Sequence, residues 1–216
     1  MHSCAASDPR DLVYACLGIC SHKYGIHPNY DPTFSVEDLL HRVAQNFISH
    51  TGDLSILRTA YLTRWRSGSN FPSWIPDWRN MPSVGQYDKP NHQQSMKCFT
   101  KLFSFHPDSQ GRPFQVLQVR GLYVGVISKG LYLWSTTASY PSRYVEQVGG
   151  TRSLDEVYLI HGFSGLLVLR RRGKQFIVVG EVLERGGVFP QLMTLVNDLE
   201  HMVETNDLAV QTISLY

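Results

Sequence analysis

FPSWIPDW, residues 71–78, places two tryptophans, two prolines and one aspartate in eight positions. Pro72 and Pro76 fix their own φ angles and disfavour helical backbone at the residues before them, so the stretch is predicted to be stiff and extended. In an extended chain Trp74 and Trp78 point to the same side, and each can bury about 200 Å². We interpret the stretch as a clamp between two layers of one fold. The alternative is an exposed site for a ligand or partner.

A helix is predicted upstream in SDPRDLVYACLGIC, residues 7–20. Ser7 or Asp8 is suited to the N-cap, and Pro9 to the first helical position, where its missing N–H costs nothing. Helical spacing predicts one apolar face made of Leu12, Ala15, Cys16 and Ile19.

A second helix is predicted to begin at the capping box Ser35–Asp38 and to end at Gly52. Its apolar stripe has a period close to 3.6 residues and comprises Leu39, Leu40, Val43, Phe47 and Ile48. The next segment, residues 53–65, has a pattern that fits either a strand or a helix.

From residue 98 onward the pattern is that of β-strands, with alternating or short apolar runs separated by glycine. The predicted strands are residues 98–105, 114–130, 156–162, 166–173 and 174–183, with a hairpin at Gly173-Lys174. An amphipathic helix is predicted at 190–204. The fold class is therefore α+β: a helical region (1–80), a connection (81–97), and a mainly antiparallel, small barrel-like β module with the candidate C-terminal helix (98–216).

Composition argues against a nucleic-acid-binding, a disulfide-rich and a membrane-spanning protein. The 216 residues carry a net charge of only +2, which gives no reason to expect nucleic acid as a partner. Four cysteines without a regular framework suit a reducing compartment. No apolar run approaches the roughly 18 residues that span a bilayer, and the N-terminus lacks a signal-peptide core, so a cytoplasmic protein is expected.

Motifs for catalysis or cofactors are weak. GFSGL (162–166) resembles a nucleophile elbow around Ser164, but Leu166 replaces its second glycine and strands flank it on both sides. Cys16, Cys20 and His22, with Cys4, lack the second pair that a zinc site needs. Glycine-rich phosphate loops and the HExxH motif are not found. We therefore predict no catalytic, metal-binding or cofactor-binding residues.

Scattered residues leave an enzyme as an alternative. Asp77, His161 and Glu181 are its candidates, and Glu181, at a strand end, is the strongest; a rim charge explains it more simply. A basic run forms the predicted hairpin tip and comprises Arg170, Arg171, Arg172 and Lys174. We interpret this run as solvated, with contact to an acidic partner or phosphate as the alternative.

Several motifs together resemble a known family. SDPRDLVYACLGI, NYDPTFSVEDLLHRVAQNFI, GDLSIL and FPSWIPDW follow one another over residues 7–78. Their order and spacing are similar to the region just after the HET domain of fungal heterokaryon-incompatibility proteins. Residues 156–191 resemble the C-terminal β module of that family. Two departures are Leu154-Asp155-Glu156 in place of Gly-Asp, and Leu166-Leu167 where the family has a proline.

The resemblance implies a role in fungal nonself recognition and programmed cell death. The HET domain, with its suspected NAD-directed chemistry, would precede the DPRD helix, so no active site is carried over. The matched motif residues are structural: Asp8, Pro9, Arg10, Asp11, Pro72, Trp74, Pro76, Asp77 and Trp78. The resulting expectation is a non-catalytic accessory or regulatory region whose partner is a protein, either a HET-type domain or another incompatibility factor. The alternatives are a ligand- or peptide-binding module built on Trp74, Trp78 and the basic hairpin, and a divergent hydrolase-like enzyme.

Overall fold

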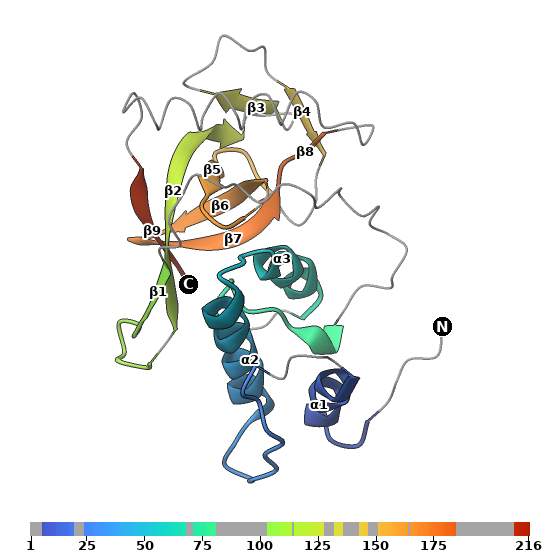
Figure 1. Cartoon of the computed structure of the whole chain (residues 1–216). Coiled ribbons are helices and arrows are strands. Elements are labelled where there is room, and N and C mark those ends of the chain that lie inside the picture. The colour runs from blue at the N-terminus through green and yellow to red at the C-terminus, as the bar shows by residue number, and fades with distance from the viewer. Residues whose placement is uncertain are drawn as a thin grey trace.

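The structure is a computed structural model that describes residues 6–19, 24–67, 71–80, 103–113, 115–127, 132–135, 143–146, 151–163, 165–184 and 210–216. Three helices come first: α1 (Arg10–Ile19), α2 (Val36–Thr51) and α3 (Ile56–Ser67), followed by the short 3-10 helix η1 (Trp78–Asn80). The strands are β1 (Phe103–His106), β2 (Val116–Ile127), β3 (Tyr132–Ser135), β4 (Arg143–Glu146), β5 (Glu156–Ile160), β6 (Leu166–Arg172), β7 (Gln175–Glu181), β8 (Leu183–Glu184) and β9 (Gln211–Leu215). The predicted α+β class is confirmed (Figure 1).

Helix α2 has the ends that the sequence predicts. The Ser35 hydroxyl accepts the Asp38 N–H at 3.0 Å, while the Asp38 carboxylate accepts the Ser35 N–H at 3.0 Å, which completes the capping box. Gly52 ends the helix in the left-handed region, with φ of 61°. The buried side chains of α2 are Leu39, Leu40, Ala44 and Ile48.

Helix α1 begins where predicted but buries a different face. The Asp8 carboxylate accepts the Arg10 N–H at 2.9 Å and caps the helix. The predicted apolar face is wrong, because Ala15 and Cys16 are exposed while Val13 and Tyr14 are buried. Arg10 and Tyr14, one turn apart, both bind the following loop, and this polar attachment sets the rotation of the helix.

The ambiguous segment 53–65 forms a helix. Leu54, Leu57 and Tyr61, which follow helical spacing, are all buried, so α3 and the turn before it bury one continuous stripe. Helix α3 contacts β7 and thereby joins the helical layer to the sheet (Figure 1).

Strand β2 is the central strand of the sheet, because it has neighbours on both sides along its length. It pairs antiparallel with β1 and then β5 on one side, and with β9 and then β3 on the other. Strands β5, β6 and β7 follow as an antiparallel meander. Gly121 lies where β5 and β9 flank β2: a Cβ there would lie 2.6 Å from Ile213 Cδ1 and 2.7 Å from Ile160 Cδ1.

The bonding closes on itself through β2, β5, β6, β7 and β9, with β1 as a sixth strand beside β2. Closure between β7 and β9 rests on one parallel register pair, Phe176 with Leu215. The sheet is therefore mostly antiparallel with ring-like bonding, as the predicted barrel-like module implies, although it is not a true barrel. The short strands β3, β4 and β8 extend it.

All five predicted strand segments contain strands. The hairpin between β6 and β7 turns at Gly173-Lys174 as predicted, with Gly173 at φ of 63°. The sequence did not predict β3, β4 and β9. The expected connection at 81–97 and the helix at 190–204 lie outside the described residues.

One hydrophobic core joins the two halves of the fold. Buried residues of the helices, such as Leu40 and Leu57, belong to the same cluster as Tyr158, Leu169 and Val178 of the sheet. The helical layer and the ring are thus packed as one body, with residues 71–78 between them.

Candidate functional site

The clamp segment, residues 71–78, is largely buried. Trp74 is fully buried and Trp78 is half-buried. The segment is not extended as predicted, because the Ile75 N–H donates to the Pro72 carbonyl at 3.1 Å and closes a turn. With this turn, Ile75 and Trp74 are both buried.

The sheet side of the clamp segment is held by Ser73 and Trp74. The Ser73 hydroxyl accepts the Val178 N–H of β7 at 2.9 Å and donates to the Tyr216 carbonyl after β9. It therefore bridges β7 and β9 just where their direct pairing stops. The Trp74 indole N–H donates to the Gln115 carbonyl at 3.1 Å, immediately before β2.

The helix side of the clamp segment is held by Asp77. Its N–H donates to the Thr63 hydroxyl of α3 at 2.8 Å. Its buried carboxylate accepts Arg79 Nε at 2.7 Å and the Arg79 N–H at 3.2 Å. Arg79 also binds Glu37 of α2 at 3.0 Å, and the hydrogen bond that Arg79 donates to Asp77 raises the pKa of Arg79. The segment thus joins α2, α3, β7 and the end of β9.

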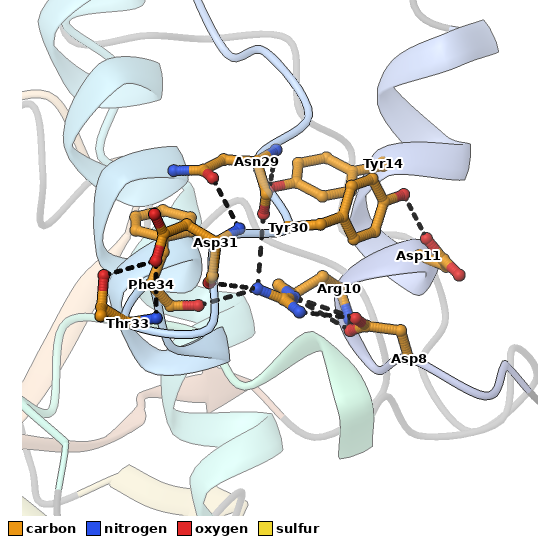
Figure 2. Close-up of polar contacts among 9 residues, drawn as sticks. All are labelled: Asp8, Arg10, Asp11, Tyr14, Asn29, Tyr30, Asp31, Thr33 and Phe34. Atoms are coloured by element: carbon orange, nitrogen blue, oxygen red, sulfur yellow. Dashed lines mark hydrogen bonds and ion pairs between the residues drawn. The ribbon is translucent and has the colours of Figure 1, made fainter.

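The DPRD motif forms a second polar cluster, the N-terminal hub, drawn in Figure 2. Arg10 binds the Asp8 carboxylate at 2.7 Å through Nη2. Its Nη1 donates to the carbonyls of Asp31 at 3.1 Å and Phe34 at 2.9 Å. One guanidinium therefore fixes the start of α1 to the loop that leads into α2. The hydrogen bond from Arg10 lowers the pKa of Asp8.

Two tyrosines complete the N-terminal hub (Figure 2). The Tyr14 hydroxyl donates to the Asn29 carbonyl at 3.1 Å and accepts the Asn29 N–H at 2.9 Å. The Tyr30 hydroxyl donates to the Asp11 carboxylate at 2.5 Å, which raises the pKa of Tyr30. The Arg10 guanidinium lies 5.4 Å from the Tyr30 ring centroid.

A buried ion pair links α3 to the end of β7. Arg58 donates to the two Glu181 carboxylate oxygens, at 2.6 Å through Nε and 2.6 Å through Nη2, and the Tyr61 hydroxyl adds a hydrogen bond at 3.1 Å. The Glu181 side chain is 3% exposed, so the rim-charge interpretation is wrong. Burial lowers the pKa of Arg58, but the bonds and charge of Glu181 outweigh this effect and raise it.

The basic hairpin is only partly available to a partner. Arg170 binds Asp155 at 2.8 and 2.9 Å, and Arg171 binds Glu156 at 2.8 Å and lies over the Phe176 ring. Arg172 and Lys174 are exposed at the hairpin tip. Of the four predicted contact residues, two are therefore held by carboxylates of this chain.

The predicted site residues separate into distinct places. The DPRD residues lie in the N-terminal hub, the clamp segment lies between the layers, and the basic run lies on the sheet. Asp77 and Glu181, candidates for an enzyme, each accept hydrogen bonds from an arginine of this chain at both carboxylate oxygens. Ser164 lies outside the described residues, and its neighbours form a turn between β5 and β6.

Within the described ranges, no group of three or more His, Cys, Asp or Glu side chains is arranged to hold a metal ion. No described helix combines the length and apolar character needed to cross a bilayer.

The sequence did not reveal several residues that organise these sites. Ser73 lies within FPSWIPDW, but nothing in the sequence around it indicates the hydrogen bonds that it forms. Arg58 and Glu181 are far apart in the chain, and no local spacing connects them. The only available signal was the charge of Glu181 at the end of an otherwise apolar strand.

Comparisons with protein-family models, with curated proteins and with solved structures find no match for this chain.

Proposed function

We propose that this chain is a non-catalytic accessory region of a heterokaryon-incompatibility-type protein, and that it acts by packing against a HET-type domain. One observation carries the proposal: the two motifs that resemble the family, DPRD and FPSWIPDW, bind other parts of this same chain. Arg10 holds α1 to the loop before α2, and the clamp segment holds α2 and α3 to β7 and β9. Motifs used in this way build a rigid support.

The charged groups of the fold favour a supporting role over a catalytic one. A general base needs a carboxylate or imidazole that is free to accept a proton from its substrate. Asp77 and Glu181 instead receive paired hydrogen bonds from Arg79 and Arg58. Both oxygens of each carboxylate are therefore already occupied by an arginine of this chain, rather than presented to a substrate.

The ligand-binding alternative has less support. Trp74 is fully buried and its indole N–H already donates to Gln115, so it offers a ligand neither a face nor a donor. Among the other residues of this alternative, Trp78 is half-buried and the tip residues Arg172 and Lys174 are exposed, while the exposed Arg171 is bound to Glu156. These groups belong to separate elements, η1 and the β6–β7 hairpin.

The proposal is tested by joining the chain to a HET domain. Three proteins are expressed in fungal cells: a HET domain alone, the same domain followed by this chain, and the same domain followed by an unrelated β domain of similar size. We expect this chain, and not the unrelated domain, to change the extent of cell death at equal expression.

A variant tests whether the effect depends on the rigid structure of this chain or only on a chain being joined to the HET domain. Asp77→Ala removes the carboxylate that holds Arg79 and should weaken the effect of the chain, whereas Ser7→Ala, at an exposed residue before α1, should leave it intact. Equal cell death from all three fusions would contradict the proposal. A measurable hydrolase or transferase activity of the isolated chain that is lost on Glu181→Gln would favour the enzyme instead.

A further inference from the structure

Strand β1, Phe103–His106, lies at the margin of the sheet. It pairs antiparallel with β2, from Phe103 opposite Val119 to His106 opposite Val116. Figure 1 shows β1 at the outer side of the ring, below β9. In the part of the chain that the structure describes, β1 has no second strand neighbour.

The hydrogen-bond pattern shows which backbone groups of β1 face outward. The Arg120 carbonyl accepts the His161 N–H at 2.9 Å, so Arg120 directs its backbone groups to the side of β2 that carries β5 and β1. Alternate residues of an antiparallel strand point their N–H and C=O to the same side, so Gln118 does likewise. Ser104, opposite Gln118, therefore bonds to β2.

It follows that Phe103 and Phe105 direct their N–H and C=O groups away from β2. None of the described residues forms a hydrogen bond with these four groups. Among the described residues this edge of the sheet is unpaired, and an unpaired edge accepts another strand. Phe105 is held in place by the Trp74 ring, at a centroid distance of 5.6 Å, so the edge is supported by the clamp segment.

We propose that β1 pairs antiparallel with β1 of a second copy of this chain, across a twofold axis that passes beside Ser104. In this register Phe103 of one copy lies opposite Phe105 of the other, and each such pair exchanges both of its backbone hydrogen bonds. Ser104 lies opposite Ser104 of the second copy, in a pair without hydrogen bonds.

The side chains of β1 are complementary to themselves in this register. Phe103 and Phe105 already form an edge-to-face pair at 5.7 Å, and the twofold axis adds the cross-strand pairs between copies. The strand contains no Asp, Glu, Lys or Arg, so pairing brings no like charges together. Ser104 is exposed, and its hydroxyl lies 2.8 Å from His106 Nε2 of the same strand. An isologous contact of this kind closes at two copies.

Sedimentation velocity of the purified full chain tests the pairing. We expect the mass to rise from 24.6 kDa toward twice that value as the concentration increases through the micromolar range. Ser104→Asp places two carboxylates face to face on the axis and should keep the protein monomeric. Ser7→Asp, the same change at an exposed residue before α1, should leave the dimer unchanged.

A cross-link tests the register itself. Paired residues of this type have Cα atoms about 4.5 Å apart, within the range that a disulfide spans. Ser104→Cys should therefore give a covalent dimer under mild oxidation, faster than Ser7→Cys or the unmodified chain. A monomer at all concentrations, a dimer insensitive to Ser104→Asp, or equal cross-linking of the two cysteine variants would overturn the proposal. If the protein is a monomer at all concentrations, the β1 edge would instead be open to a strand of another protein. None of these results depends on cell death, so this proposal and the proposed function can fail separately.

Discussion

At the scale of single residues, arginines determine how this fold holds its carboxylates. Arg10 binds Asp8, Arg58 binds Glu181 and Arg79 binds Asp77. Each guanidinium also reaches a second element or loop, which a lysine could not do with the same planar, multidentate geometry. Arg58 and Glu181 are far apart in the chain, whereas Arg10 and Arg79 bind a carboxylate two residues away and reach distant parts of the chain through their other contacts.

The N-terminal hub should respond to acid. Arg10 lowers the pKa of Asp8 below its unfolded value of about 3.9, so the stability that the pair contributes is present above that value and is lost as pH falls through the lowered pKa. We expect the amides of α1 to stay protected in hydrogen exchange at pH 5 and to lose protection near pH 3 and below. In Asp8→Asn, α1 should be less protected at neutral pH and its protection should change little with acid. Equal acid sensitivity in both proteins would contradict this account.

The buried Arg58–Glu181 pair should be costly to break on one side only. Glu181→Gln keeps the shape but leaves the Arg58 cation uncompensated, and we expect a loss of about 3 kcal/mol in the free energy of unfolding, measured with urea. The double variant Arg58→Met/Glu181→Leu removes both charges. Its loss of unfolding free energy should be smaller than the sum of the losses of Arg58→Met alone and Glu181→Leu alone. Strict additivity would show that the two residues contribute independently.

At the scale of elements, the ends of helices were easier to predict than the faces they bury. Ser35, Asp38 and Gly52 act through neighbours within one turn, so the limits of α2 could be predicted from the sequence. The rotation of α1 could not, because it depends on contacts of Arg10 with a loop some twenty residues away. The turn at Pro72 and the register of β9 likewise depend on groups that only the folded chain brings together.

Gly121 should be required for two strands to flank β2 closely. In Gly121→Ala the new methyl group would lie 2.6 Å from Ile213 Cδ1 and 3.0 Å from the Leu159 carbonyl oxygen, and backbone cannot move aside easily. We expect a loss of about 1–3 kcal/mol in the free energy of unfolding. Ile213→Val, which removes the closest atom, should restore part of that loss.

Gly18 provides the matched control. It lies in α1 and a Cβ there would meet nothing within 4 Å, so Gly18→Ala should be neutral or stabilising by up to about 1 kcal/mol. If both alanine variants lost stability equally, the close packing at Gly121 would not be the cause.

At the scale of the whole molecule, the α+β order followed from the change of hydrophobic period near residue 98. The mutual packing of the two halves did not, because it rests on Ser73 and on the Arg58–Glu181 pair, whose partners are remote in sequence. The clamp interpretation agrees with the burial of Trp74, although the segment is turned rather than extended.

The helical layer and the ring should therefore unfold together. In urea, far-UV circular dichroism and tryptophan fluorescence should give coincident, single transitions, since one core and the clamp segment join both halves. The native emission should be blue-shifted, and Trp74→Phe should remove part of the blue-shifted intensity. Separate transitions for the two signals would show that the halves are independent units.

The position of β9 has a consequence for how the chain acquires its structure. Residues 211–215 pair with residues 117–121, so the ring cannot close until a late part of the chain has found an early one. Contacts of such long sequence separation make folding slow, because the entropy of closing the loop is lost before any pairing compensates for it. Helix α2, with its local caps, can form early. The edge of β2 that pairs with β9 stays unpaired until β9 arrives. Refolding measurements should find the slowest phase in the amides of β9 and of Val178.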